Sequence, residues 1–172
     1  MKTKLIVNSL VLALICLAGP APADSATRSV ETTKHMPVSP ERVIEAFLDA
    51  EELASWWKVS RSLTERKQGG IWSVAWDDWG ADETQHAWIG VIDEVTADKL
   101  VIGHLVMLEP DMPLLGPMQL EIRVESAEGG SIVSVSHRGY GYGDHWDSFY
   151  QEVVAGWDHV LGDLQAWFDE VY

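Results

Sequence analysis

Two histidines, His104 and His137, stand in apolar, strand-like parts of the sequence, where an imidazole could act as a general base or hold a ligand. A histidine in such a place is more often a hydrogen-bonded part of the core. The sequence has no G-x-S-x-G motif, and Ser134 and Ser136 are ordinary strand residues, so a serine-hydrolase triad is not indicated. We therefore predict no catalytic residue. An enzyme of the cyclase or hydrolase kind, which would use one of these histidines with a tyrosine such as Tyr142, is the first alternative.

Metal and cofactor chemistry is not indicated either. His137, His145 and His159 do not have the spacing of a zinc site. The acidic stretch Asp77–Glu83 lacks the spacing of a calcium loop, and we expect a solvated hairpin loop there. The stretch Gly139–Gly143 lies between a strand and the last helix, so no βαβ unit follows that would make it a phosphate cradle. We predict no metal and no cofactor.

Tryptophan is frequent, with nine residues in a chain of 172. Three of them fall at alternating positions of expected strands and a fourth on the apolar face of a helix, so their indoles could point into one shared space. Ligand pockets are commonly lined by aromatic side chains with a few polar groups, although indoles can equally fill a core. We favour the pocket and predict six ligand-binding residues. They are Trp72, Trp76, Trp88, His104, His137 and Trp157.

The helix that would position the fourth indole is expected over Asp147–Tyr172, with Asp147 or Ser148 as its N-cap. Its apolar residues recur at steps of three and four, which places them on one face. They are Phe149, Val153, Gly156, Trp157, Val160, Leu161, Leu164, Trp167, Phe168 and Val171. Gly156 and Gly162 each cost about 1 kcal/mol relative to Ala inside a helix, so we expect a side chain or ligand to approach the backbone there.

The rest of the chain is expected to form the sheet that holds this helix. A first strand covers Arg28–Met36, and two short helices follow, one with Ser39 as N-cap and Pro40 at its first position, the other capped by Asp49. Six further strands are expected at Val59–Arg66, Gly70–Asp77, Gln85–Val95, Leu100–Leu108, Met118–Ser126 and Ser131–His137. The order β-α-α-β6-α predicts an α+β helix-grip fold, in which a curved antiparallel sheet surrounds the long C-terminal helix.

The first 23 residues have the composition of a cleavable signal peptide. Lys2 and Lys4 precede the apolar run Leu5–Ala18, and an A-x-A site ends at Ala23, with cleavage expected before Asp24. The run is shorter than the roughly 20 residues that span a bilayer, so we expect no membrane segment after processing. We predict one domain over residues 24–172, without cysteine, in the periplasm or secreted.

Charge argues against two classes of partner. Without Lys2 and Lys4, ten basic residues stand against 27 acidic ones, a formal net charge of −17. Such a chain repels nucleic-acid phosphates and anionic membrane surfaces. We expect a small apolar molecule as the partner and no nucleic acid.

Several short segments together carry a resemblance to a known family. They are Val38–Trp57 (VSPERVIEAFLDAEELASWW), Gly69–Trp72, Gly90–Val95 with Asp98–Leu100, Val135–Gly139, and Ala155–Trp157 with Leu161 and Leu164. In this order and spacing they resemble the START-like (SRPBCC) superfamily, and within it the branch similar to the C-terminal domain of the activator of the ninety-kilodalton heat-shock protein's ATPase. The resemblance implies a hydrophobic cavity between sheet and helix for lipids, sterols, polyketides or other apolar molecules. It implies no single reaction, and an exported protein would not meet a cytosolic chaperone.

The sequence thus predicts a periplasmic or secreted helix-grip protein that binds a small apolar molecule. Besides the enzyme named above, the second alternative is a protein-interaction module that presents exposed tryptophans and has no cavity.

Overall fold

The structure is a computed structural model that describes residues 27–79 and 84–172. The predicted signal peptide and residues 80–83 of the acidic stretch lie outside the described residues. The elements follow in the order β1 (Arg28–Met36), α1 (Pro40–Ala46), α2 (Ala50–Trp56), β2 (Arg61–Thr64), β3 (Ile71–Trp79), β4 (Thr84–Val95), β5 (Lys99–Leu108), β6 (Leu115–Ala127), β7 (Gly130–Tyr140) and α3 (Asp144–Val171). The predicted order β-α-α-β6-α is confirmed.

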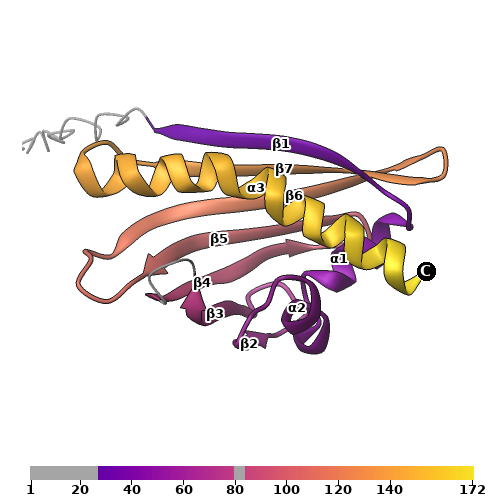
Figure 1. Cartoon of the computed structure of the whole chain (residues 1–172), viewed down its shortest axis with the longest axis horizontal. Helices are drawn as coiled ribbons and strands as arrows, with labels where there is room; N and C mark the ends of the chain where they lie inside the picture. The colour runs from indigo at the N-terminus through magenta and orange to yellow at the C-terminus, as the bar shows by residue number, and fades with distance from the viewer. Residues whose placement is uncertain (1–26, 80–83) are drawn as a thin grey trace, which may run out of the picture.

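One antiparallel sheet contains all seven strands, in the spatial order β1-β7-β6-β5-β4-β3-β2. Each strand from β2 to β7 pairs with the next along the chain, and β1 closes the order beside β7. The long helix α3 lies across one face of this curved sheet, with its first turns beside β1 and β7 and its last turns near α1 (Figure 1). The predicted α+β helix-grip fold is confirmed.

Alternation along β6 shows which face of the sheet is covered. Met118, Leu120, Ile122 and Val124 are all buried, as their period of two predicted, and the residues between them are half-buried or exposed. The same alternation in β7 buries Val133, Val135 and His137. These inner side chains meet the apolar face of α3.

The predicted apolar face of α3 is buried over most of its length. Phe149, Val153, Trp157, Val160, Leu161, Leu164 and Phe168 are buried, whereas Trp167 is half-buried and Val171 is exposed at the last turn. The predicted N-cap was wrong, because the helix begins at Asp144, after Gly143. The carboxylate of Asp147 instead pairs with Arg28 at 2.7 Å, and Trp146 in the added turn packs on Tyr140. These contacts explain the earlier start.

The two short helices begin at the predicted caps. The Ser39 hydroxyl accepts from the backbone N–H of Arg42, with Pro40 at the first position of α1. The Asp49 carboxylate accepts from the N–H groups of Glu51 and Glu52 at the start of α2. These caps fix the direction of the chain that delivers Trp57 to the inner face of the sheet.

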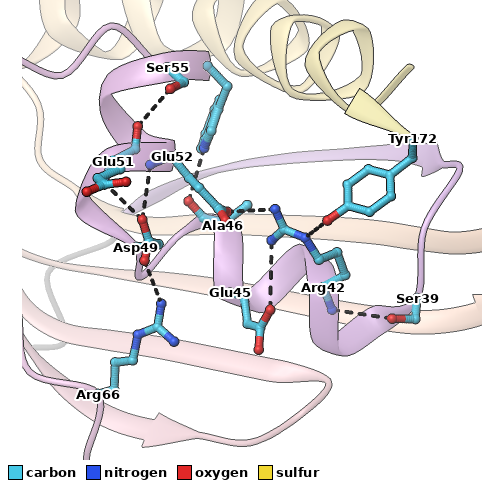
Figure 2. A network of polar contacts seen from close by, with 11 residues as sticks. Ser39, Arg42, Glu45, Ala46, Asp49, Glu51, Glu52, Ser55, Arg66 and Tyr172 are labelled. Carbon is cyan, nitrogen blue, oxygen red and sulfur yellow. Dashed lines mark hydrogen bonds and ion pairs between the residues drawn. The ribbon is translucent and has the colours of Figure 1, made fainter. Parts of the chain in front are cut away.

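Arg42 of α1 connects both short helices to the end of α3 (Figure 2). Its guanidinium lies 2.8 Å from the Glu52 carboxylate, and its Nε donates to the hydroxyl of Tyr172. The guanidinium also lies over the rings of Trp167, Phe168 and Tyr172, at 5.4, 5.4 and 5.5 Å. The C-terminal end of α3 is thereby held against α1 and α2.

A bulge in β5 changes which face its side chains take. Ile89 pairs with Val106 and Val91 with Gly103, so three steps along β5 oppose two along β4. The extra residue is accommodated at His104, whose φ is 50°. Leu100 and Ile102 point inward before the bulge, and Leu105 and Met107 after it. His104 is consequently exposed.

Candidate ligand pocket

A small pocket lies between α3 and the sheet, with a volume of about 90 Å³. Its walls come from α3, the strands β3 and β4, and the residue that follows α2. The lining residues are Trp57, Trp76, His86, Trp88, Phe149, Glu152, Val153, Gly156, Trp157 and Val160. The pocket is mainly apolar, and Glu152 and His86 are its titratable groups.

Four indoles form much of the wall because the end of α2, the strands β3 and β4, and α3 each direct one of them to the same place. On the paired strands β3 and β4, Trp76 stands opposite His86 and Val74 opposite Trp88, so Trp76 and Trp88 share the inner face. Their ring centroids are 6.0 Å apart. Trp57 lies 5.2 Å from Trp76 and 5.9 Å from Trp157, which links the sheet to the helix. The pocket occupies the space that this cluster leaves open.

Hydrogen bonds fix two of these indoles. The indole N–H of Trp76 donates to the backbone carbonyl of Trp57 at 3.0 Å. That of Trp157 donates to Nδ1 of His137 at 3.4 Å. Buried indoles with partners of this kind hold one orientation, so the wall is formed in advance of any ligand.

Gly156 supplies open space on the helix side of the pocket. A Cβ built on Gly156 would meet no heavy atom within 4 Å, whereas one on Gly162 would lie 3.7 Å from the Lys34 ammonium. No side chain of the described residues approaches the backbone at Gly156, so a ligand is the expected neighbour that stays a prediction there. The space beside Gly156 belongs to the pocket. A glycine inside a helix costs about 1 kcal/mol relative to alanine, and no contact with a neighbouring side chain requires glycine here.

His137 lies behind the wall, fully buried, with its ring 5.3 Å from Trp88 and 4.8 Å from Tyr140. Burial lowers the pKa of its imidazole to about 3 and raises the pKa of the Tyr140 hydroxyl, which lies 2.6 Å from Nδ1. Because the indole of Trp157 can only donate, Nδ1 accepts and the neutral ring carries its proton on Nε2. Within the described residues, Nε2 has no hydrogen-bond acceptor.

The structure brings together some of the six predicted site residues and separates others. Trp76, Trp88 and Trp157 line the pocket, and His137 contacts two of them from behind. Trp72 faces inward but is fully buried in the core, where its indole donates to the carbonyl of Phe47 at 2.9 Å. His104 does not face this space at all, because the β5 bulge turns it outward.

Several lining residues were missed by the sequence reasoning, although the pattern contained them. His86 stands two residues before Trp88 on β4 and therefore shares its face. Glu152 is exposed, as predicted for the outer face of the helix, but lies three residues after Phe149 and four before Gly156 and so borders the pocket. Trp57 could not be placed in advance, because its position depends on how α2 packs.

Two features bear on the alternatives. Tyr142, named as a catalytic partner for histidine, is 60% exposed beneath the Arg28 guanidinium, while His137 is joined to Tyr140 instead. The eight tryptophan side chains that the structure describes are all buried or half-buried, so none of them offers an exposed docking residue.

The described residues contain no candidate for a metal site or a membrane span. No group of three His, Cys, Asp or Glu side chains in residues 27–79 and 84–172 could hold a metal ion. Within the same residues, no helix is long and apolar enough to cross a membrane.

Comparison with known proteins agrees with this architecture. Residues 37–169 match the family model described as activator of Hsp90 ATPase homolog 1-like protein. The chain belongs to this family. The match covers both short helices, the sheet from β2 to β7 and nearly all of α3, so the START-like resemblance is confirmed. No curated protein matches the chain by sequence.

Solved structures share the fold at low identity. A protein of Chromobacterium violaceum is 23% identical, with a TM-score of 0.61 over 80% of this chain and 95% of its own. The AHSA1 protein of Silicibacter pomeroyi is 17% identical, with a TM-score of 0.66 over 84% of this chain and all of its own. At these identities the likeness establishes the helix-grip architecture only.

Proposed function

We propose that this protein binds a small apolar molecule in the pocket between α3 and strands β3 and β4. The observation that carries the proposal is Gly156, a helix-interior glycine beside open space that is walled by four indoles. A residue chosen only for helix stability would be alanine, whose methyl group would project into the pocket. The sequence thus forgoes helix stability at a position of α3 where a larger side chain would reduce the pocket.

The size of the pocket limits the ligand. About 90 Å³ is below the roughly 150 Å³ of an apolar protein cavity known to bind benzene, and well below the 300 to 1,000 Å³ typical of sites for drug-sized ligands. The indoles fill most of the deep space that the family resemblance implied. We therefore expect the pocket to take only part of a ligand, such as the edge of one ring or a branched alkyl group, with the remainder extending past Glu152 into solvent.

Export is the second part of the proposal, and its basis is the sequence of residues 1–23. The basic start, the short apolar run and the A-x-A site together favour cleavage before Asp24 and a periplasmic or secreted protein. With the formal net charge of −15 for the whole chain, an apolar or cationic small molecule is favoured over nucleic acid as the partner.

Titration of a neutral single-ring compound tests the binding proposal. Ethylbenzene is added to ¹⁵N-labelled protein, and the indole N–H signals of the tryptophans are followed. We expect saturable shifts for Trp88 and Trp157, which line the pocket. The indoles of Trp56 and Trp72, which donate to the carbonyls of Ala46 and Phe47, are internal references that should move little.

If the signals of Trp88 and Trp157 show no saturable shift, or if all indoles shift equally, the proposal that this pocket binds a small apolar molecule is contradicted. Chemical conversion of an added substrate would instead favour the enzyme alternative, in which the neutral, deeply buried His137 would have to move a proton despite its low pKa.

A further inference from the structure

The acidic side chain that lines the pocket has no basic partner in the described lining. Among its ten lining residues, Glu152 is the one carboxylate and none is lysine or arginine. His86 is the one lining residue that can become a cation, and its Nδ1 lies 3.6 Å from a carboxylate oxygen of Glu109. His86 therefore already faces an acid, and the negative charge of Glu152 remains.

Glu152 has no counter-ion among the described residues. Its side chain is exposed, and no ion pair links it to any residue in the described part of the chain. Arg28 is already paired with Asp147, five residues earlier on the same helix. A carboxylate left unpaired at the edge of an apolar pocket can stabilise a positive charge on a bound molecule, as a salt bridge does.

The aromatic walls of the pocket also favour a positive charge on the ligand. Tryptophan attracts cations more strongly than the other aromatic side chains, and an ammonium group within about 6 Å of an indole gains about two- to thirtyfold in affinity. Trp57, Trp76, Trp88 and Trp157 all lie on this pocket. The excess of acidic residues in the chain adds a long-range attraction for cations and a repulsion for anions.

We infer that the pocket selects small organic cations: a single ring or branched alkyl body joined to an ammonium group, with the ring among the indoles and the positive charge beside Glu152. The inference rests on the proposed function and adds the charge of the ligand to it. It excludes fatty acids and other apolar anions as preferred ligands, because no lysine or arginine is among the described residues that line the pocket and His86 faces the Glu109 carboxylate.

Three probes of nearly equal shape test the inference by calorimetry at low ionic strength. Benzyltrimethylammonium is the cation, neopentylbenzene its neutral isostere, and phenylmethanesulfonate the anion. We expect the cation to bind about two- to thirtyfold more tightly than neopentylbenzene, and the sulfonate to bind more weakly than either. Raising the salt concentration should weaken the binding of the cation and leave the binding of neopentylbenzene nearly unchanged.

Two variants separate a local charge from the overall charge of the protein. Glu152→Gln keeps the shape of the side chain and should weaken benzyltrimethylammonium about two- to fivefold without changing neopentylbenzene. Glu170→Gln removes the same charge from the same helix about 27 Å further along its axis and should leave all three affinities unchanged.

The outcomes distinguish the inference from the function on which it rests. If none of the three probes binds, the proposed pocket function fails. If neopentylbenzene binds and the cation binds no more tightly, or the sulfonate binds equally well, the pocket function stands and the charge selectivity is overturned. A cation preference that Glu152→Gln and Glu170→Gln reduce by the same amount would overturn the role of Glu152.

Discussion

Replacing Gly156 by alanine should make the protein more stable and its pocket smaller at the same time. Alanine is favoured over glycine in a helix interior by about 0.8 to 1.0 kcal/mol, and a Cβ at this position meets no atom within 4 Å. We therefore expect a gain of about 1 kcal/mol, or roughly 2 to 4 °C in melting temperature for a domain of this size. Few substitutions in a buried surface are expected to stabilise in this way.

The same methyl group should weaken ligand binding. A methyl group is close in size to a water molecule, whose share of liquid volume is about 30 Å³, so it would occupy about a third of the roughly 90 Å³ pocket. A ligand that must share this space meets overpacking costs of about 1 to 3 kcal/mol, which correspond to a fivefold or greater loss of affinity. Ethylbenzene affinity, measured by the indole shifts, is the readout.

Gly162→Ala is the matched control. Gly162 also lies inside α3, but its Cβ would make an ordinary contact with Lys34 and does not line the pocket. Gly162→Ala should stabilise the helix by a similar amount without changing ethylbenzene affinity. The reasoning is refuted if Gly156→Ala destabilises the protein, or if it leaves ethylbenzene affinity equal to that of Gly162→Ala.

Three further predictions concern the core, the contacts by which Arg42 holds the end of α3 against α1 and α2 (the helix clamp), and export. The pKa of His137 is about 3 in the folded protein against about 6.5 unfolded, so acidification protonates the unfolded chain first. The contribution of His137 to the free energy of unfolding is complete above pH 6.5 and falls by roughly 2 to 3 kcal/mol by pH 4.5. Urea unfolding of His137→Leu should lack this pH dependence. The same pH profile in His137→Leu as in the unaltered protein would contradict the prediction. Arg42→Ala should lower the free energy of unfolding by roughly 2 to 3 kcal/mol, because charged hydrogen bonds and ring contacts at the end of α3 are lost. Arg123→Ala, at an exposed position, should lower it by under about 1 kcal/mol, and thermal unfolding measures both. Equal effects of the two arginine variants would count against the clamp. N-terminal sequencing of the exported protein should begin at or near Asp24, and intact Met1 in a soluble cytoplasmic fraction would contradict export.

The fold could be predicted because its pattern is periodic over long segments. Alternation along β6 and steps of three and four along α3 are set by backbone geometry, and both survive in the structure. His104 shows where this reasoning fails. A single extra residue in β5 reverses the face of every side chain that follows. The isolated Gly103 just before His104 is the kind of residue that marks a bulge, but the period of two alone placed His104 inward.

The site was less predictable than the fold, because it depends on packing between distant elements. Trp72 and Trp76 have the same strand period, yet Trp72 meets α1 and is sealed in the core while Trp76 borders the pocket. Whether an inward indole fills space or lines it is decided by its neighbours in three dimensions. Glu152 lies on the polar edge of the helix by sequence, and only the position of α3 on the sheet reveals that this edge adjoins the pocket.

The most direct test of the central claim is a crystal structure of the protein grown with bromobenzene, whose bromine can be located by anomalous scattering. Our account predicts a bromine peak between α3 and β4, in contact with Gly156 and the indoles of Trp88 and Trp157. The same crystals grown from Gly156→Ala should show a weaker peak or none. A clear bromine peak elsewhere in the molecule, with none between α3 and β4, would contradict the account.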